Sequence, residues 1–194
     1  MRMDADPIKQ FASWYRDAEA SVKSMPEAVC LCTADPSGRP SARMVLMKGF
    51  DADGFVFFTN YESRKAMEMI TNPQAFLLFY WKELGRQVRI EGPVERVSSE
   101  ESDDYFATRP RQSQLGAWAS AQSRPIKSRF TLLRKVASVA ARFANKPVER
   151  PPHWGGFRLH PDRMEFWHDR PFRLHDRFEY RMDQGVWKME RLSP

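Results

Sequence analysis

The sequence of 194 residues is poor in cysteine and glycine and contains no long apolar run. Two cysteines, Cys30 and Cys32, are too few for a disulfide framework or a four-ligand zinc site. They stand one residue apart in an apolar stretch, which predicts small core residues of a reduced, cytoplasmic protein. Because no window of about 18 uninterrupted apolar residues exists, no membrane-spanning helix and no membrane partner are expected. The charged start, MRMDADPIKQ, lacks the apolar core of a secretion signal.

The common signatures of catalysis and metal binding are also missing. The chain has no nucleophile elbow, P-loop, HExxH or GxGxxG motif. Its four histidines stand at 153, 160, 168 and 175, and none pairs with a carboxylate at helical spacing. We therefore expect no metal site.

The basic residues are concentrated in one segment. The net charge is +6, and ten lysines and arginines fall between Arg109 and Arg150, where Glu149 is the single acid. A local positive field attracts an anion, which could be a nucleic acid, a protein partner or the phosphate of a small molecule. A solvated helix face explains the same charge equally well. No aromatic-basic nucleic-acid motif is present, so no nucleic-acid partner is expected.

The apolar periodicity changes along the chain. Spacings of three and four predict an N-terminal helix at about 7–24. Period-two runs bounded by turn residues predict strands within about 28–97 and 155–192, with a short helix at 63–72 capped by Ser63. A helical insertion is expected at about 98–146, including a long helix from Pro125 to Ala144 with an apolar stripe. The pattern indicates an antiparallel, mainly β (α+β) fold, most simply a closed barrel that has no exposed edges.

Four groups of polar residues could carry chemistry. Ser63, Arg64 and Lys65 open a helix, and a helix N-terminus with adjacent cations suits a phosphate. Arg43 and Lys48 flank an apolar strand and lie on opposite faces of it. The other two groups are Tyr105, Arg109 and Ser113 with Gln122 and Ser123, and Arg173, His175 and Arg177 with Asp176. Each group also has a plain structural interpretation as a solvated surface, loop or strand end.

Several long runs together resemble one family. They are RMVLMK (43–48), FFTNYESRK (57–65), RQVRIEG (86–92), YFATRPRQSQLGAWASAQS (105–123), HWGGFR (153–158), EFWHDRPFRLHDRF (165–178) and the closing WKMERLSP. From about residue 7 to the C-terminus, the chain resembles the pyridoxine/pyridoxamine 5′-phosphate oxidases. The resemblance implies an FMN-binding split β-barrel over 1–194 as a single domain, and a homodimer with two flavin sites at its interface.

The resemblance also assigns roles to residues. It implies FMN binding by Arg43, Met44, Val45, Leu46, Met47, Lys48, Phe58, Thr59, Arg64, Lys65, Gln87, Gln122, Ser123, Trp167 and Arg177. It implies that Lys48, Tyr105, Arg109 and Ser113 hold the substrate phosphate, and that catalytic Arg173 and His175 close over the substrate ring with Leu174 between them. Strand alternation would point Leu174 into the core. Departures from the family pattern are Met44, Met47, Phe58, a bulky HDRPF segment and a short N-terminus, which puts an N-terminal lid in doubt.

The implied reaction is FMN-dependent oxidation of pyridoxamine 5′-phosphate and pyridoxine 5′-phosphate to pyridoxal 5′-phosphate. Hydride transfer to the flavin and reoxidation by O2, giving hydrogen peroxide, would complete it. The alternative is a related split-barrel flavin oxidase acting on another aromatic ring, such as a phenazine precursor, since a fold alone does not separate the two.

Overall fold

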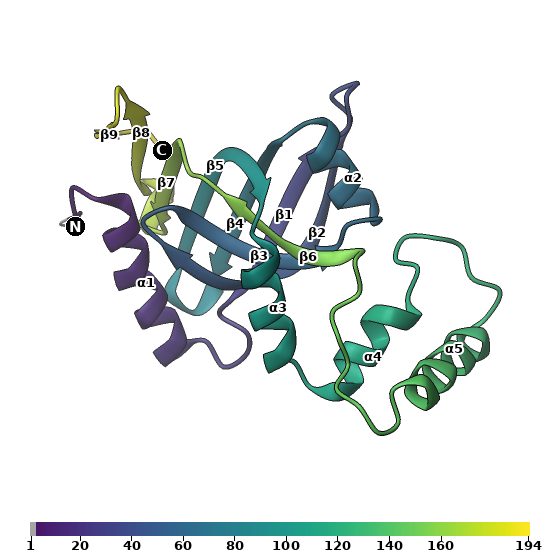
Figure 1. Ribbon diagram of the computed structural model, residues 1–194. Helices are drawn as coiled ribbons and strands as arrows, with labels where there is room; N and C mark the ends of the chain where they lie inside the picture. Colours follow the sequence, from purple (N-terminus) through teal and green to yellow (C-terminus); the bar gives the residue numbers. More distant parts are fainter. Residues whose placement is uncertain (1–2) are drawn as a thin grey trace.

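The structure is a computed structural model and describes residues 3–194 (Figure 1). Six antiparallel strands close into a barrel in the order β4-β1-β2-β3-β6-β5, and β5 pairs back onto β4. These strands are β1 Ala28–Ala34, β2 Pro40–Asp51, β3 Gly54–Asn60, β4 Gln74–Trp81, β5 Arg86–Arg96 and β6 Trp154–Leu159. The predicted antiparallel barrel is confirmed.

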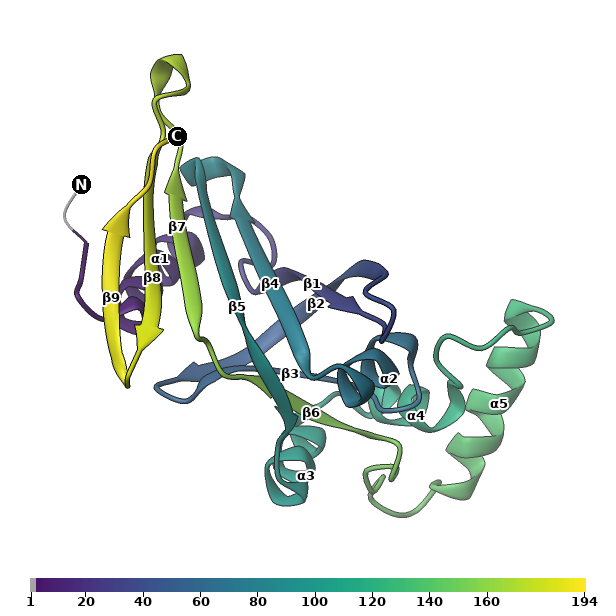
Figure 2. The ribbon, with the colours of Figure 1, turned by 90° about the horizontal axis from the view of Figure 1, so that it is seen from above.

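Strand β5 belongs to two parts of the sheet because it bends at Gly92. Before the bend β5 pairs with β4 and with β7 (Arg163–His168), and from Val94 it pairs with β6. A Cβ at Gly92 would collide with the backbone carbonyl of His160, so only glycine fits this crossing. Strands β8 (Asp176–Asp183) and β9 (Val186–Arg191) extend the sheet beyond β7 (Figure 2).

The barrel core is aromatic and is covered by helix α1 (Pro7–Ser21), which ends three residues earlier than predicted. Asp6 caps this helix by accepting from two backbone N–H groups, and Pro7 occupies its first turn. Phe11 is fully buried and packs edge-on against Phe50 and Phe55. The apolar stripe of the N-terminal helix therefore fills the barrel.

The helical insertion forms a second, smaller core beside β6. It contains α3 (Ser99–Thr108), α4 (Arg111–Ala119) and α5 (Arg129–Arg142). Phe106, Leu115 and Phe143 pack there around Trp154. Pro110, the N-cap residue of α4, separates α3 from α4. The short helix α2 (Arg64–Thr71) lies between β3 and β4.

Three expectations from periodicity are wrong. Helix α5 begins four residues after Pro125, and its apolar residues Phe130 and Leu133 are exposed, because α5 packs on α4 and not on the barrel. Cys30 and Cys32 are half-buried and lie outside the core. On β1 they alternate with buried Leu31, so their side chains face outward from the barrel.

Candidate functional site

A cavity of about 360 Å³ lies between β2, β3 and the helical insertion. It brings together residues that are far apart in the sequence. Its lining consists of Arg43, Met44, Val45, Leu46, Lys48, Phe58, Thr59, Asn60, Lys65, Tyr105, Arg109, Gln122 and Trp154. Eleven of these thirteen were predicted as cofactor or substrate residues; Asn60 and Trp154 were not.

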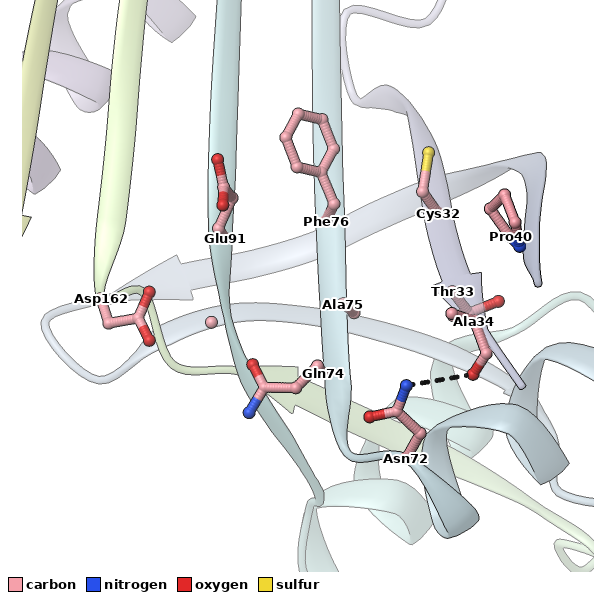
Figure 3. A pocket seen from close by; sticks show the side chains of 11 residues that line it. Cys32, Thr33, Ala34, Pro40, Asn72, Gln74, Ala75, Phe76, Glu91 and Asp162 are labelled. Atoms are coloured by element: carbon pink, nitrogen blue, oxygen red, sulfur yellow. Dashed lines mark hydrogen bonds between the residues drawn. The ribbon is translucent and has the colours of Figure 1, made fainter. Parts of the chain in front are cut away.

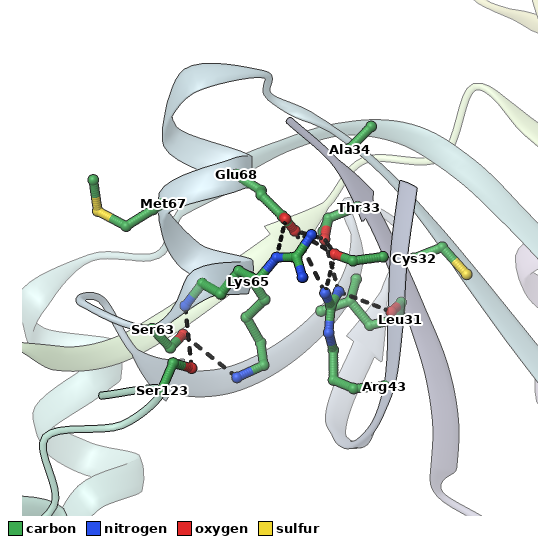
Figure 4. Close-up of polar contacts among 12 residues, drawn as sticks. Leu31, Cys32, Thr33, Ala34, Arg43, Ser63, Lys65, Met67, Glu68 and Ser123 are labelled. Atoms are coloured by element: carbon green, nitrogen blue, oxygen red, sulfur yellow. Dashed lines mark hydrogen bonds and ion pairs between the residues drawn. The ribbon is translucent and has the colours of Figure 1, made fainter. Parts of the chain in front are cut away.

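One end of the cavity is basic and lies at the N-terminus of α2 (Figure 4). The Lys65 ammonium donates to Gln122 Oε1 at 3.0 Å and to Thr59 Oγ1 at 3.3 Å. Burial and then the charge of Arg43 lower the pKa of Lys65. A half-buried ammonium beside free helix N–H groups is a suitable seat for a phosphate.

The predicted capping role of Ser63 is not what the structure shows. Ser63 occupies the N-cap position of α2, but its side chain makes no capping hydrogen bond. Its hydroxyl instead accepts from Lys65 at 3.4 Å. The backbone N–H of Arg64 donates to Ser123 Oγ at 3.3 Å. Ser123 has a φ of 68°, a left-handed conformation that is strained for serine.

A buried carboxylate lies behind this basic end. Glu68 accepts from the hydroxyls of Thr33 at 2.5 Å and Ser41 at 2.6 Å, and from Arg64 Nε at 2.7 Å. A longer contact of 3.4 Å reaches Arg43. Burial raises the pKa of Glu68, but the hydrogen bonds from Ser41, Thr33 and Arg64 outweigh it and bring the pKa to about 2. Glu68 is therefore ionised at neutral pH.

The opposite end of the cavity is aromatic and carries a second cation. The rings of Phe58 and Tyr105 stack at 4.0 Å, and Phe58 stacks on Trp154 at 5.4 Å. The Arg109 guanidinium lies over the Trp154 ring at 4.6 Å. Its NH1 is buried and has no hydrogen-bond partner among residues 3–194. Burial lowers the pKa of Arg109. An unpaired buried cationic donor of this kind is stabilised by an acceptor such as an anion.

A second group of predicted residues lies on the outer face of β5, β7 and β8. Gln87 pairs with Trp167, and Trp167 pairs with Arg177, so the three form one row across the strands. The buried carboxylate of Glu165 holds Arg177 through two bonds, of 2.8 and 3.1 Å. His175 packs on Trp167 with ring centroids 4.6 Å apart. None of these residues lines the 360 Å³ cavity.

The segment before β8 differs from the extended strand that was predicted. Pro171–Arg173 form a 3-10 turn, and Phe172 and Arg173 have φ values of 60° and 62°. Leu174 is 67% exposed, so the expectation that it points into the core is wrong. Strand alternation begins only at Asp176, where the side chain is held by Arg170 at 2.7 Å.

Of the predicted residues on β2, α2 and the helical insertion, Met47, Arg64, Ser113 and Ser123 do not line the cavity. Met47 is buried in the barrel core, because the alternation of β2 puts it on the inward face with Val45. Ser113 is exposed on α4, and Arg64 is exposed at its tip beside Lys65. The structure therefore divides the predicted site residues between the cavity, its rim, the barrel core and the outer face of β5, β7 and β8.

A different groove, of about 400 Å³, lies on the outer face of β1, β4 and β5 (Figure 3). Its charged lining residues are Glu91 and Asp162, and it has no lysine or arginine. A negative field repels phosphate. Of the two cavities, only the one at α2 can take an anionic ligand.

The comparisons with known proteins agree with this geometry. A family model described as "Pyridoxamine 5'-phosphate oxidase" matches residues 16–143. A second, "Pyridoxine 5'-phosphate oxidase C-terminal dimerisation region", matches residues 154–194. The chain belongs to the pyridoxamine 5′-phosphate oxidase family. Membership confirms two predictions, that the protein is an oxidoreductase and that its cofactor is FMN.

Curated members of the family match almost the whole chain. A pyridoxine/pyridoxamine 5′-phosphate oxidase of Rubrobacter xylanophilus is 56% identical, over 98% of this chain and 88% of that protein. One from Azorhizobium caulinodans is 55% identical, over 97% of this chain and 90% of that protein. The resemblance inferred from the motifs is therefore confirmed.

Solved structures show the same fold. PhzG from Burkholderia lata, in complex with tetrahydrophenazine-1-carboxylic acid, superposes with a TM-score of 0.93 at 32% identity, covering 98% of this chain and 94% of that one. A pyridoxamine 5′-phosphate oxidase-related, FMN-binding protein from Nostoc punctiforme gives 0.77 at 21% identity, covering 99% of this chain and all of that one. The predicted FMN-binding split β-barrel is confirmed.

Besides Asn60, sequence reasoning missed the polar residues Glu68 and Glu165. Each is a buried carboxylate that holds an arginine assigned to the flavin site. Glu68 follows Arg64 by four residues on a helix, a spacing that predicts an ion pair. No comparable local signal marks Glu165, because its partner Arg177 lies on the neighbouring strand.

No helix among the described residues is long and apolar enough to cross a membrane.

Proposed function

We propose that this protein oxidises pyridoxamine 5′-phosphate and pyridoxine 5′-phosphate to pyridoxal 5′-phosphate. The observation that carries the proposal is one cavity with two separate basic ends, Lys65 at α2 and Arg109 beyond the aromatic wall. A flavin mononucleotide and a phosphorylated ring each bring one phosphate. Two anionic groups therefore match the two cationic ends.

The residues present fit FMN. Lys65, the free N–H groups of α2 and the exposed tip of Arg64 form a seat for one terminal phosphate. The chain contains no glycine fingerprint for a dinucleotide. When bound, FMN would supply the redox chemistry, as acceptor of a hydride from the substrate's C4′ carbon and donor of two electrons to O2, which would give hydrogen peroxide. With the amine substrate, water then hydrolyses the imine and ammonia leaves.

The substrate phosphate fits the other end. Arg109 offers an unpaired buried nitrogen, and Tyr105 and Lys48 line the same cavity. Together they place two positive charges and a hydroxyl beside a dianion. We call Lys48, Tyr105, Arg109 and Ser113 the phosphate clamp. Ser113 is exposed on α4, and only the resemblance to the family assigns it to this clamp.

The row of Gln87, Trp167 and Arg177, called the outer row below, would supply the remaining flavin-binding groups if two copies combine. Trp167 and Arg177 belong to β7 and β8, and these strands lie toward one side of the molecule while α2 lies toward the other (Figures 1 and 2). We assign a homodimer in which the outer row of one copy, with Arg173 and His175, completes the cavity of the other. The match of residues 154–194 to a dimerisation region supports this arrangement. Two-fold symmetry then gives two equivalent sites.

A hybrid dimer tests the shared site. Arg109→Ala and His175→Ala should each be nearly inactive, since each removes a group from both sites. Co-expressed copies form hybrids in about half of the dimers, and each hybrid has one intact site, so about a quarter of wild-type oxidation of pyridoxamine 5′-phosphate should return. The measurement is oxygen uptake by the purified mixture.

The control is a mixture of Arg109→Ala with Lys48→Ala. Both changes fall in the same cavity, so no hybrid regains an intact site and the mixture should stay inactive. Absence of recovery in the first mixture, with hybrids demonstrated by mass, would show that each site is built from one copy.

The alternative function is oxidation of an unphosphorylated aromatic acid, as the ligand of the Burkholderia lata structure suggests. Sequence identity favours the phosphorylated forms of the vitamin, pyridoxamine 5′-phosphate and pyridoxine 5′-phosphate (the phosphorylated vitamers). The chain is 56% identical to a curated pyridoxine/pyridoxamine 5′-phosphate oxidase and 32% identical to PhzG. The buried NH1 of Arg109, which has no partner within residues 3–194, favours them as well.

A further inference from the structure

Glu68 is the one acid in contact with the arginines at the phosphate seat, among the residues that the structure describes. Its side chain is 6% exposed and lies between α2 and the strands β1 and β2 (Figure 4). Removing a carboxylate from water is expensive unless several donors replace the water. Glu68 receives donors from Thr33, Ser41 and Arg64, so the site is built around it.

The two arginines are held in different ways. Arg43 is enclosed, because its NH1 donates to Leu31 O at 3.0 Å and to Thr33 Oγ1 at 2.7 Å, while its NH2 bonds Ser41. Arg64 is held at Nε alone, and no residue within 3–194 accepts from its two terminal nitrogens. Glu68 thus anchors the base of the Arg64 guanidinium and leaves the tip directed to a ligand.

The charges at this end of the cavity also balance around Glu68. Arg43, Arg64 and Lys65 are three cations, and the ionised Glu68 leaves a net charge of +2. A phosphate monoester carries about −1.5 to −2 at neutral pH. Without Glu68, two arginines and a lysine would face one another with no intervening anion.

We propose that Glu68 is a positioning residue for the flavin phosphate, acting through Arg64. It orients the guanidinium before the cofactor arrives and fixes Arg43 as the wall behind it. Pre-orientation reduces the side-chain entropy lost on binding. The inference rests on the proposed FMN site, and it concerns binding of the phosphate and not of the flavin ring.

The test compares FMN with riboflavin, which has the same ring and no phosphate. Flavin fluorescence titrations of the apoprotein give both dissociation constants. In Glu68→Gln the preference for FMN over riboflavin should fall by about tenfold or more, the equivalent of one charge-assisted hydrogen bond. The affinity for riboflavin should stay within about twofold of wild type, because no contact to the ring changes.

Glu62→Gln is the matched control. Glu62 is exposed, lies two residues before Arg64 and makes no side-chain hydrogen bond within the described chain. The Glu62→Gln substitution removes the same charge near the same end of α2 but does not touch Arg64, so the preference for FMN over riboflavin should not fall. In an Arg64→Ala background, Glu68→Gln should cause little additional loss, which identifies Arg64 as the intermediary.

Several outcomes would overturn the role of Glu68. Equal weakening of FMN binding and riboflavin binding would show that Glu68 has a purely structural function. Tighter FMN binding would show that the charge of Glu68 only repels the phosphate. If Glu68→Gln does not fold, Glu68→Asp keeps the charge but is one methylene shorter, and it must still lose part of the FMN preference. A wild-type protein with no preference for FMN would instead refute the FMN site itself.

Discussion

Pyridoxine and pyridoxamine without a 5′-phosphate should be oxidised on the order of 10⁴-fold less efficiently than their phosphates. A site built for a charged group leaves buried donors unpaired when that group is missing. Arg109 is already such a donor, with NH1 buried and unpartnered within residues 3–194. Lys48 and Tyr105 line the same cavity and add a second charge and a hydroxyl. The measurement is kcat/KM for each vitamer with and without its phosphate.

Replacing Arg109 by lysine sharpens this prediction. A guanidinium can grip two phosphate oxygens at once, which an ammonium cannot. Arg109→Lys should therefore raise KM for the phosphorylated vitamer and leave the FMN content unchanged. Arg129→Lys is the matched control, because Arg129 is exposed at the start of α5 in the same basic segment. Comparable efficiency on both forms of the vitamer would dismiss the clamp.

Replacing Arg64 and Lys65 together by alanine should abolish retention of the cofactor. Each charge-assisted hydrogen bond contributes about 1.5–3 kcal/mol, so losing two weakens FMN binding by roughly 10² to 10⁴-fold. Wild-type protein should release FMN on heating, identified by chromatography, whereas the double variant should be purified colourless. Recovery of FAD from the wild-type protein would contradict the proposal that the seat at α2 holds a single terminal phosphate.

Two exposed cations elsewhere serve as the control for this pair. Lys127→Ala with Arg129→Ala removes the same charge from the basic segment, and both positions are exposed. That variant should keep its FMN. If the control variant loses as much FMN as the Arg64 and Lys65 double variant, FMN is held by the long-range positive field and not by a phosphate seat at α2.

The fold was predictable because most of its strands form a hairpin with the next strand along the chain and have clear period-two patterns. The Gly92-Pro93 pair stands in the sequence where β5 turns from β4 to β6 and closes the barrel. The predicted start of α5 was wrong by four residues, since apolar spacing continues through residues 125–128 although the helix does not. Periodicity also could not show that α5 packs on α4 and leaves Phe130 exposed.

The site was predictable only in part, and for a physical reason. Residue types and spacing marked Lys65 and Arg109, because cations beside hydroxyl groups near helix ends are suited to bind a phosphate. Glu68 was missed because its role depends on Thr33 of β1 and Ser41 of β2, which are far from it in the sequence. The strained turn at Phe172 was missed because a positive φ at a bulky residue has no sequence signal.

The most direct test of the central claim is oxygen uptake by the FMN-loaded protein with pyridoxamine 5′-phosphate. We predict one pyridoxal 5′-phosphate, one hydrogen peroxide and one ammonia for each O2 consumed, and the same without ammonia for pyridoxine 5′-phosphate. Omitting O2 should stop turnover after the flavin is reduced once. An FMN-loaded dimer that oxidises neither phosphate, or that oxidises a ring without a phosphate as readily, would contradict the assignment.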